Sequence, residues 1–301
     1  MERSVSTFPR GSDLGPRPHQ FSPPTTGAAA PLLRIARRRV SLSGALITVA
    51  SIVITLALWW AVAALVTQLR GIPFPTPLDT FQRLLALVRG RLLVDFTIYR
   101  HLGDSLRRWG IGFSLAMSVG IISGLLFGWS RLLERLSMPT VTVLQLIPGL
   151  AWVPVAILLF GIGERSTVFM IAVTSLAPIV INTTAGVKGV NELLVRAAKM
   201  LGADSRTLFL RVLLPGSLPH LLSGLRVGFA NGWRVLVAGE MVVGTGTGLG
   251  YSIIQSRWTL DYAGAFVCIA IICMIGLIVE RGLLLPLERR TVDRWGLART
   301  T

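Results

Sequence analysis

Six apolar runs dominate this sequence and limit the folds that are open to it. The hydrocarbon core of a bilayer is about 30 Å thick, so an α-helix needs about 20 mainly apolar residues to cross it. Each run is about that long, which predicts an all-α, polytopic membrane protein of about six transmembrane helices. The third and fourth runs are separated only by GIGERS. The expected helices cover about 43–67, 109–129, 138–160, 166–187, 217–240 and 262–285.

The overall composition agrees with a membrane protein. Hydrophobic residues make up 52% of the 301 residues and charged residues only 15%, whereas a soluble domain averages about 25% charged residues. The mean hydropathy is +0.67. A net charge of +16 comes from 30 Lys and Arg against 14 Asp and Glu. Because most of these cations lie between the apolar runs, they fit loops at a membrane surface and argue against a nucleic-acid partner.

The same cations predict how the chain crosses the membrane. They gather before the first expected helix, between the second and third, between the fourth and fifth, and after the sixth. By the positive-inside rule these segments and both termini are cytoplasmic. Residues 68–108 are an exception, because they carry seven arginines on the expected outer side. Part of this segment, PLDTFQRLLALVRGRLLVDF, has apolar residues at helical spacing and predicts an interfacial helix on the outer surface.

The composition also sets the expected domain boundaries. Residues 1–40 are predicted to be a disordered, basic cytoplasmic tail, since most of this segment is rich in Pro, Ser, Gly and Thr. Residues 41–290 form the expected transmembrane domain, which includes a cytoplasmic loop at 188–216. Residues 291–301 form a second cytoplasmic tail. The protein is therefore expected to be a multi-pass protein in contact with membrane lipid.

The loop at 188–216 is longer and more basic than a connection between two membrane helices requires. Its central part reads RAAKMLGADSRTLFLRVLLPGSLP. Ala197, Ala198 and Gly202 carry little side-chain bulk, so a partner can approach the backbone, and Gly202 is a natural helix stop. Pro215 precedes the next helix. These features predict a docking element for another protein. No lysine lies in a G-x-x-x-x-G-K-[ST] phosphate loop, so any ATP would be bound by another chain.

Small residues recur every four positions in the second expected helix. Such a stripe lets another helix approach closely. Packing within this chain is the favoured interpretation, and an interface with a second subunit is the alternative, because the stripe indicates close approach and not the identity of the partner. The residues are Gly112, Ala116, Gly120, Gly124 and Gly128.

The fifth expected helix carries polar residues that are costly at membrane depth. Such side chains usually face a cavity or each other. Asn231 and Arg234 are three residues apart and share a helix face, and Glu240 follows. An arginine on a transport path suits an anionic cargo, because its guanidinium pairs with carboxylate, sulfonate or phosphate oxygens. The favoured interpretation of Arg234 is a structural ion pair with a glutamate of another helix. The functional alternative is that these three residues line a translocation path.

Three further motifs bear on the shape of the chain. Pro148 and Pro154 interrupt the third expected helix and Pro178 the fourth. Each proline kinks its helix, either for shape alone or as a bend in a moving pore helix. The stretch GTGTGLG at 244–250 lacks the spacing of a nucleotide-binding loop and predicts a flexible or re-entrant loop. No residue set indicates catalysis, and no histidine lies in a metal-ligand pattern.

The loop at 188–216 resembles the EAA loop of type I ABC importer permeases, the inner-membrane components of binding-protein-dependent transport systems. That family's pattern is Glu-Ala-Ala, three residues, Gly, nine residues, an aliphatic residue, one residue and Leu-Pro. The matching residues are Ala197, Ala198, Gly202, Val212, Leu214 and Pro215. Arg196 stands where the family has glutamate, which reverses a charge. Glu192, one helical turn earlier, is a candidate substitute.

The resemblance extends over roughly residues 95–290. LIPGLAWVPVAILLFGIG, INTTAGVKGV and LVAGEMVVGTGTGLGY are similar to the subgroup that imports nitrate, alkanesulfonates and taurine. The resemblance implies a MetI-like permease in a bacterial plasma membrane that is not itself an enzyme and binds no cofactor. It implies a permease dimer, two cytoplasmic ATPase subunits that hold ATP and Mg²⁺, and an external solute-binding protein. The residues expected to couple the chain to the ATPase are Glu192, Arg196, Ala197, Ala198, Gly202, Ala203 and Pro215.

Two other functions stay open at this point. A secondary transporter or channel acting without an ATPase would carry acidic or histidine proton relays or inverted repeats. No convincing repeat is present and buried carboxylates are few. A structural or assembly membrane protein is the third possibility, and it would not explain the long basic loop that ends in Leu-Pro.

Overall fold

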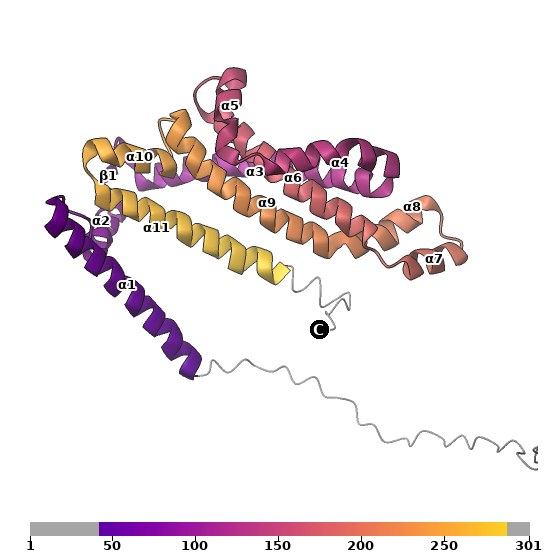
Figure 1. Ribbon diagram of the computed structural model, residues 1–301, viewed down its shortest axis with the longest axis horizontal. Coiled ribbons are helices and arrows are strands. Elements are labelled where there is room, and N and C mark those ends of the chain that lie inside the picture. Colours follow the sequence, from indigo (N-terminus) through magenta and orange to yellow (C-terminus); the bar gives the residue numbers. More distant parts are fainter. Residues whose placement is uncertain (1–41, 288–301) are drawn as a thin grey trace, which may run out of the picture. The chain divides into compact units, whose positions relative to one another are not determined.

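The computed structural model describes residues 42–287, and it is helical apart from one short hairpin (Figure 1). The two expected tails, 1–40 and 291–301, lie outside the described residues. The chain divides into two compact units at Ile52 and Val53. Of the first unit, only the first turns of α1 are described. The second unit, from Val53 onward, holds every contact discussed below.

The elements follow one another along the chain with short connections. They are α1 (Leu42–Arg70), α2 (Pro77–Val88), β1 (Leu92–Leu93), β2 (Phe96–Thr97), α3 (Ile98–Trp129), α4 (Arg131–Leu146), η1 (Gly149–Trp152), α5 (Val153–Phe160), α6 (Glu164–Lys188), α7 (Glu192–Met200), α8 (Ser205–Leu208), η2 (Phe209–Leu213), α9 (Leu214–Val243), α10 (Leu249–Thr259), α11 (Tyr262–Val279) and η3 (Glu280–Leu284). The strands β1 and β2 pair antiparallel, with Leu93 opposite Phe96.

Five helical segments of the described residues are long and apolar enough to cross a membrane. Their bounds are Val49–Arg70, Ile98–Trp129, Glu164–Lys188, Ser205–Val243 and Tyr262–Leu287. They correspond to the first, second, fourth, fifth and sixth expected helices. A sixth span is obtained if α4 and the η1–α5 segment count as one broken crossing. The fold class predicted from the apolar runs, an all-α membrane protein of about six spans, is confirmed.

The third expected helix, 138–160, is not one straight helix. It is divided between α4 and the η1–α5 segment, which meet at an angle of 103°. The division falls at Pro148, which has no backbone N–H and pushes Ile147 into an extended conformation. Gly149 follows and lies so close to Val235 of α9 that a Cβ would overlap it. The break therefore places η1 against α6 and α9.

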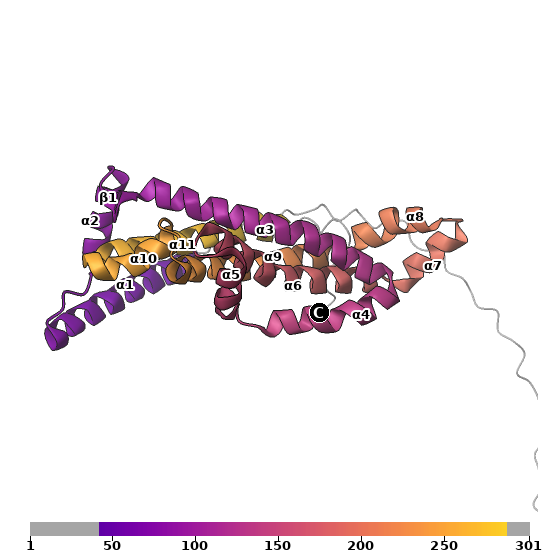
Figure 2. The same ribbon diagram turned by 90° about the horizontal axis from the view of Figure 1, so that it is seen from above.

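The packing core of the spans is formed by α6, which lies between α3 and α9 (Figures 1 and 2). The small residues of α3 face α6. A Cβ on Gly112 would approach Ile171 to 2.8 Å, and one on Gly124 would approach Thr183 to 2.6 Å. Gly120 and Gly128 are equally close to α6, and Ala116 is buried. The stripe thus serves packing within this chain, where it lets the two helix backbones approach closely.

A second row of glycines on α9 packs against the other side of α6. Cβ atoms on Gly224 and Gly228 would approach Asn182 and Ile179 to 2.7 Å and 2.9 Å, and Gly232 lies against Ser175. The recurrence of glycine every four residues was visible in the sequence of the fifth helix. Because both neighbours of α6 approach through glycine, this helix is enclosed from two sides.

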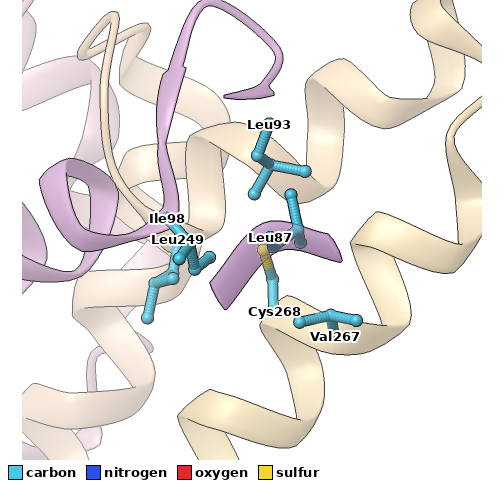
Figure 3. Packing of buried hydrophobic residues seen from close by; sticks show 6 residues of the cluster. All are labelled: Leu87, Leu93, Ile98, Leu249, Val267 and Cys268. Atoms are coloured by element: carbon cyan, nitrogen blue, oxygen red, sulfur yellow. The ribbon is translucent and has the colours of Figure 1, made fainter. Parts of the chain in front are cut away.

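A smaller apolar cluster joins α2, the β1–β2 hairpin, the start of α3, α10 and α11 (Figure 3). Its buried members are Leu87, Leu93, Ile98, Leu249, Val267 and Cys268. Helix α2 lies within the segment that was predicted to form an interfacial helix. It begins with a capping box between Thr76 and Asp79, and Arg83 Nη2 binds Asp261 Oδ2 at 2.5 Å, which ties α2 to the start of α11.

Candidate functional site

The loop predicted to dock a partner folds into the short helices α7 and α8. Both lie beyond the ends of α6 and α9 (Figures 1 and 2). Asn191 caps α7, since its Oδ1 accepts a hydrogen bond from the Leu193 N–H at 2.9 Å. Asp204 caps α8 and accepts from the Thr207 N–H at 3.1 Å. Hydrogen bonds from the Thr207 side chain and backbone lower the pKa of the Asp204 carboxyl. Two capped ends give this exposed segment a defined shape.

The turn between α7 and α8 requires glycine at position 202. Gly202 has a φ of +83°, which glycine adopts at no steric cost. Its N–H donates to Lys199 O at 3.0 Å, and the Ala203 N–H donates to Ala198 O at 3.0 Å. Outside residues 201–203, no described atom lies within 4 Å of the position of a Cβ on Gly202. The backbone angle therefore explains this glycine within the chain, and the open space above it is available to a partner.

Arg196, which departs from the family pattern, pairs with Glu192. Arg196 Nη2 lies 2.7 Å from Glu192 Oε2, and the two side chains are 68% and 78% exposed. A pair of this kind on an exposed helix contributes about 0.3–0.5 kcal/mol. Ala197 is exposed and Ala198 half-buried on the same helix. The reversed charge is thus compensated weakly within α7 and stays accessible to a partner.

Large apolar side chains project from the end of α7. Met200 is 88% exposed and Leu201 is 89% exposed, and Leu193 is also exposed. Further along, Pro215 lies in the first turn of α9, directly after the π-helical segment η2. The last part of the docking segment 192–215, which is α8 and η2, therefore forms one helical run with α9 from Ser205 to Val243.

A polar face of α9 borders a cavity of about 360 Å³. Asn231 is half-buried and Arg234 is exposed on this face. Within residues 42–287 no carboxylate lies within 4 Å of Arg234. The arginine of α9 that does form an ion pair there is Arg226, whose Nη2 lies 2.8 Å from Glu280 Oε1. The ion pair favoured for Arg234 is therefore not found in the described part of the chain.

Glu240 was assigned to the same path, but the structure places it elsewhere. Its side chain is 0% exposed and its carboxylate accepts from several donors in the interior. Arg108 Nη1 lies 2.8 Å from Oε1, the Ser105 hydroxyl donates at 2.8 Å, and the Gly250 N–H donates at 2.9 Å. A carboxylate bound in this way holds α3, α9 and α10 together, so its position indicates a structural role.

We call one group of side chains the α3–α9 polar cluster. It consists of Ser105, Arg108, Glu164 and Glu240, which bond to one another, and of His101, which accepts a hydrogen bond from the nearby Gly248 N–H. Arg108 is 1% exposed, and its Nη2 also lies 2.9 Å from Glu164 Oε1. Buried charges are stable only when they are paired and hydrogen-bonded. The Arg108 Nη atoms meet this requirement fully, because they also donate to the carbonyl and hydroxyl oxygens of Thr247 at 2.7 Å.

The cluster also fastens the glycine-rich stretch at 244–250, which was predicted to be a flexible or re-entrant loop. The Gly248 N–H donates to His101 Nδ1 at 3.0 Å, and the Leu249 N–H donates to Ser105 Oγ at 2.9 Å. A Cβ on Gly248 would overlap the Glu240 carboxylate. The end of the stretch is therefore held to the cluster by its own backbone N–H groups.

Sequence reasoning missed the α3 members of this cluster, because the second helix was expected to begin at residue 109. It begins at Ile98 instead. His101, Ser105 and Arg108 follow one another at intervals of four and three residues, which places them on one helix face. This polar spacing just before an apolar run was the available signal. It could have shown that the helix starts earlier and that its first turns face other polar groups.

Four of the seven arginines between residues 68 and 108 form ion pairs in the structure. The pairs are Arg83–Asp261, Arg100–Asp104, Arg107–Glu164 and Arg108 with both Glu164 and Glu240. Much of the positive charge of this segment therefore has local carboxylate partners. Among residues 42–287, no group of three or more His, Cys, Asp and Glu side chains is placed to hold a metal ion.

Comparison with known proteins relates this geometry to transport. The family described as "Binding-protein-dependent transport system inner membrane component" matches residues 116–292. The taurine transport system permease protein TauC of Escherichia coli (strain K12) is 33% identical over 253 residues, which are 84% of this chain and 89% of that protein. The nitrate import permease protein NrtB of Synechocystis sp. is 30% identical over 230 residues, which are 73% of this chain and 83% of that protein.

Solved structures share the fold. An inward-facing crystal form of the MetNI methionine ABC transporter superposes with a TM-score of 0.55 at 17% sequence identity. The match covers 62% of this chain and 93% of that chain. At this identity the likeness concerns the arrangement of the helices alone.

Proposed function

Because this chain belongs to the family of inner membrane components of binding-protein-dependent transport systems, we propose that it is the permease subunit of an ABC importer for a small anionic solute. An alkanesulfonate, taurine or nitrate is the best candidate cargo, since relatives are named as taurine and nitrate permeases. The chain would form the translocation path and take its energy from a separate ATPase. That partner would dock on the segment 192–215.

The observation that carries the choice of an anion is Arg234, which has no carboxylate within 4 Å among residues 42–287. It lies nine residues before the end of α9 at Val243, which is about 14 Å along a helix axis. That depth is near the middle of a hydrocarbon core about 30 Å thick. An arginine facing lipid there would cost several kcal/mol, so such a residue faces a water-filled path or another subunit. Its guanidinium fork suits sulfonate, carboxylate or nitrate oxygens.

The proposed docking of an ATPase rests on the exposed end of α7. Met200 and Leu201 place apolar surface in water, which is unfavourable by about 25 cal/mol for each Å² until a partner covers it. The adjoining Ala197 and Gly202 leave room for close approach. Because α8, η2 and α9 form one helical run, a displacement of the docked segment would be carried to the helix that bears Arg234.

The proposed assembly follows the family. Two copies of the chain would form the path, two ATPase subunits would bind ATP and Mg²⁺, and a solute-binding protein would deliver cargo from outside. Both termini and α7 would lie in the cytoplasm of a bacterial cell, with α2 at the outer surface. This orientation agrees with the cations that gather around α7.

Two variants separate docking from transport. The chain would be co-expressed with the ABC ATPases and solute-binding proteins of the same genome, and complexes reconstituted in liposomes would be tested with taurine, methanesulfonate and nitrate. Met200→Ser combined with Leu201→Ser should release the ATPase on purification. Arg234→Gln should retain the ATPase and reduce anion uptake at least tenfold.

A matched control comes from Leu158 of α5, which is 86% exposed. Leu158→Ser should retain both the ATPase and transport, because an exposed leucine outside the docking segment is not expected to contact the ATPase. Uptake driven by an ion gradient without ATP would overturn the proposal and favour a secondary transporter. Full uptake by Arg234→Gln would remove the argument for an anionic path.

A further inference from the structure

The cavity beside α9 has arginines at two levels, and only one of them has a carboxylate partner in the described structure. Arg226 and Arg234 both line it. They are eight residues apart, so they lie about 12 Å from each other along the helix axis. Arg234 has no carboxylate within 4 Å among the described residues, whereas Arg226 binds Glu280 at 2.8 Å. An anion that leaves Arg234 toward the docking segment would therefore meet an arginine that is already occupied by a carboxylate.

The Arg226–Glu280 pair is open to the cavity. The two side chains are 37% and 43% exposed. A partly exposed ion pair shifts an equilibrium by only a factor of a few, because water and dissolved ions compete with it. The pair is therefore weak enough to exchange with an anion. The Arg108–Glu240 pair differs in this respect, since both of its side chains are enclosed.

Glu280 also lies where a helix changes its geometry. It is the first residue of the π-helical segment η3, which directly follows α11. Short π-helical segments inside helices occur frequently at functional sites. Arg226 belongs to the run that continues through η2 into α8. The two partners thus sit on separate helices, and a displacement of one helix relative to the other would change their distance.

On the basis of the proposed anion path, we propose that Glu280 is a tethered counter-ion that closes the inner end of this cavity. Its carboxylate would occupy Arg226 at rest, and an anionic cargo released from Arg234 would replace it. The same guanidinium fork accepts oxygens of a carboxylate, a sulfonate or a nitrate ion. The exchange needs a negative charge on the cargo, so it would select against uncharged analogues at the exit step.

A charge swap distinguishes this role from a purely structural pair. In the reconstituted complex, ATP-dependent uptake of taurine, methanesulfonate and nitrate would be measured for Glu280→Gln, for Arg226→Glu, and for Arg226→Glu combined with Glu280→Arg. Glu280→Gln should lower KM about threefold and also lower kcat, because Arg226 then holds the anion and releases it slowly. The swapped pair should restore assembly and thermal stability lost in Arg226→Glu, but uptake should stay at least tenfold below wild type.

The matched control is Arg107→Gln, which breaks another partly exposed ion pair between two helices, that of Arg107 with Glu164. It should leave uptake unchanged, because Glu164 keeps Arg108 as a partner. Wild-type uptake by the swapped Arg226/Glu280 pair would overturn the counter-ion role and leave a structural one. An unchanged KM and kcat for Glu280→Gln would overturn it as well. If the wild-type complex itself shows no ATP-dependent uptake of any of these anions, the proposed function fails, independently of the variants.

Discussion

Breaking the Arg108–Glu240 pair is expected to be costly because neither partner has access to water. Replacing Arg108 by methionine would leave the Glu240 carboxylate enclosed, with the Ser105 hydroxyl and the Gly250 N–H as neutral donors. Removing one partner of a buried pair typically costs about 3–5 kcal/mol. Replacing Glu240 by glutamine should cost less, about 1–3 kcal/mol, because Arg108 keeps the Glu164 carboxylate at 2.9 Å.

The coupling free energy between Arg108 and Glu240 tests the ion pair more directly than the stability loss of either single variant. When Arg108→Met and Glu240→Gln are combined, no uncompensated charge of the pair is left in the interior. The double variant should therefore lose less stability than the two single variants together, by at least about 1 kcal/mol. The double variant loses less stability because Glu240→Gln removes the carboxylate charge that Arg108→Met had left without its partner.

The assay is equilibrium unfolding of the purified chain in mixed detergent micelles, with tryptophan fluorescence as the signal. Arg107→Met provides a matched control on the same helix. Arg107 is 56% exposed and binds Glu164, which is 43% exposed and keeps Arg108, so its replacement should cost less than about 1 kcal/mol. Equal losses for Arg107→Met and Arg108→Met would refute the reasoning. The reasoning would also be refuted if the stability losses of the two single variants add up to that of the double variant within about 0.5 kcal/mol.

Two further predictions concern helix packing and the docking segment. Gly124→Ala places a Cβ 2.6 Å from Thr183 and should lower the free energy of unfolding by about 1–3 kcal/mol. Gly110→Ala, whose Cβ meets no other part of the described chain within 4 Å, should leave the stability unchanged. Unfolding midpoints compare the two variants, and equal losses of stability would contradict the packing of α3 on α6. The pKa of Asp204 is lowered by its cap, so the cap stabilises α8 above the unfolded pKa and is lost as the pH falls through the folded pKa. At neutral pH, Asp204→Ala should retain less ATPase, whereas Asp204→Asn should retain it, because asparagine still caps the helix. If both variants retain the ATPase, the cap is not needed for docking.

Much of the helical framework could be predicted because hydrophobic length is a local property. A run of about 20 apolar residues can cross a bilayer whatever it packs against, so the spans of α1, α6 and α11 lie close to their expected places. The third span was different. The break between Leu146 and Gly149 depends on Pro148, which the sequence did show, and on the space for η1 between α6 and α9, which it did not.

The candidate sites were also predictable only where they depend on local sequence. The turn at Gly202 follows from residue types that act on their own backbone, and so it was readable from the sequence. The docking role of this turn, its partner and the cargo at Arg234 are proposals, because each depends on contacts with another molecule. The pair of Arg196 with Glu192 was visible as an i, i+4 spacing and is present in the structure.

By itself, the sequence determined that this chain spans a membrane several times and carries a basic, small-residue segment between its fourth and fifth apolar runs. Both follow from local composition. Tertiary structure alone decided which charges far apart in the sequence meet. Glu240 lies 132 residues from Arg108 in the chain, and Glu280 lies 54 residues from Arg226. At such separations residue type and spacing do not select a partner, whereas the folded helices bring one pair into the interior and the other to the edge of a cavity.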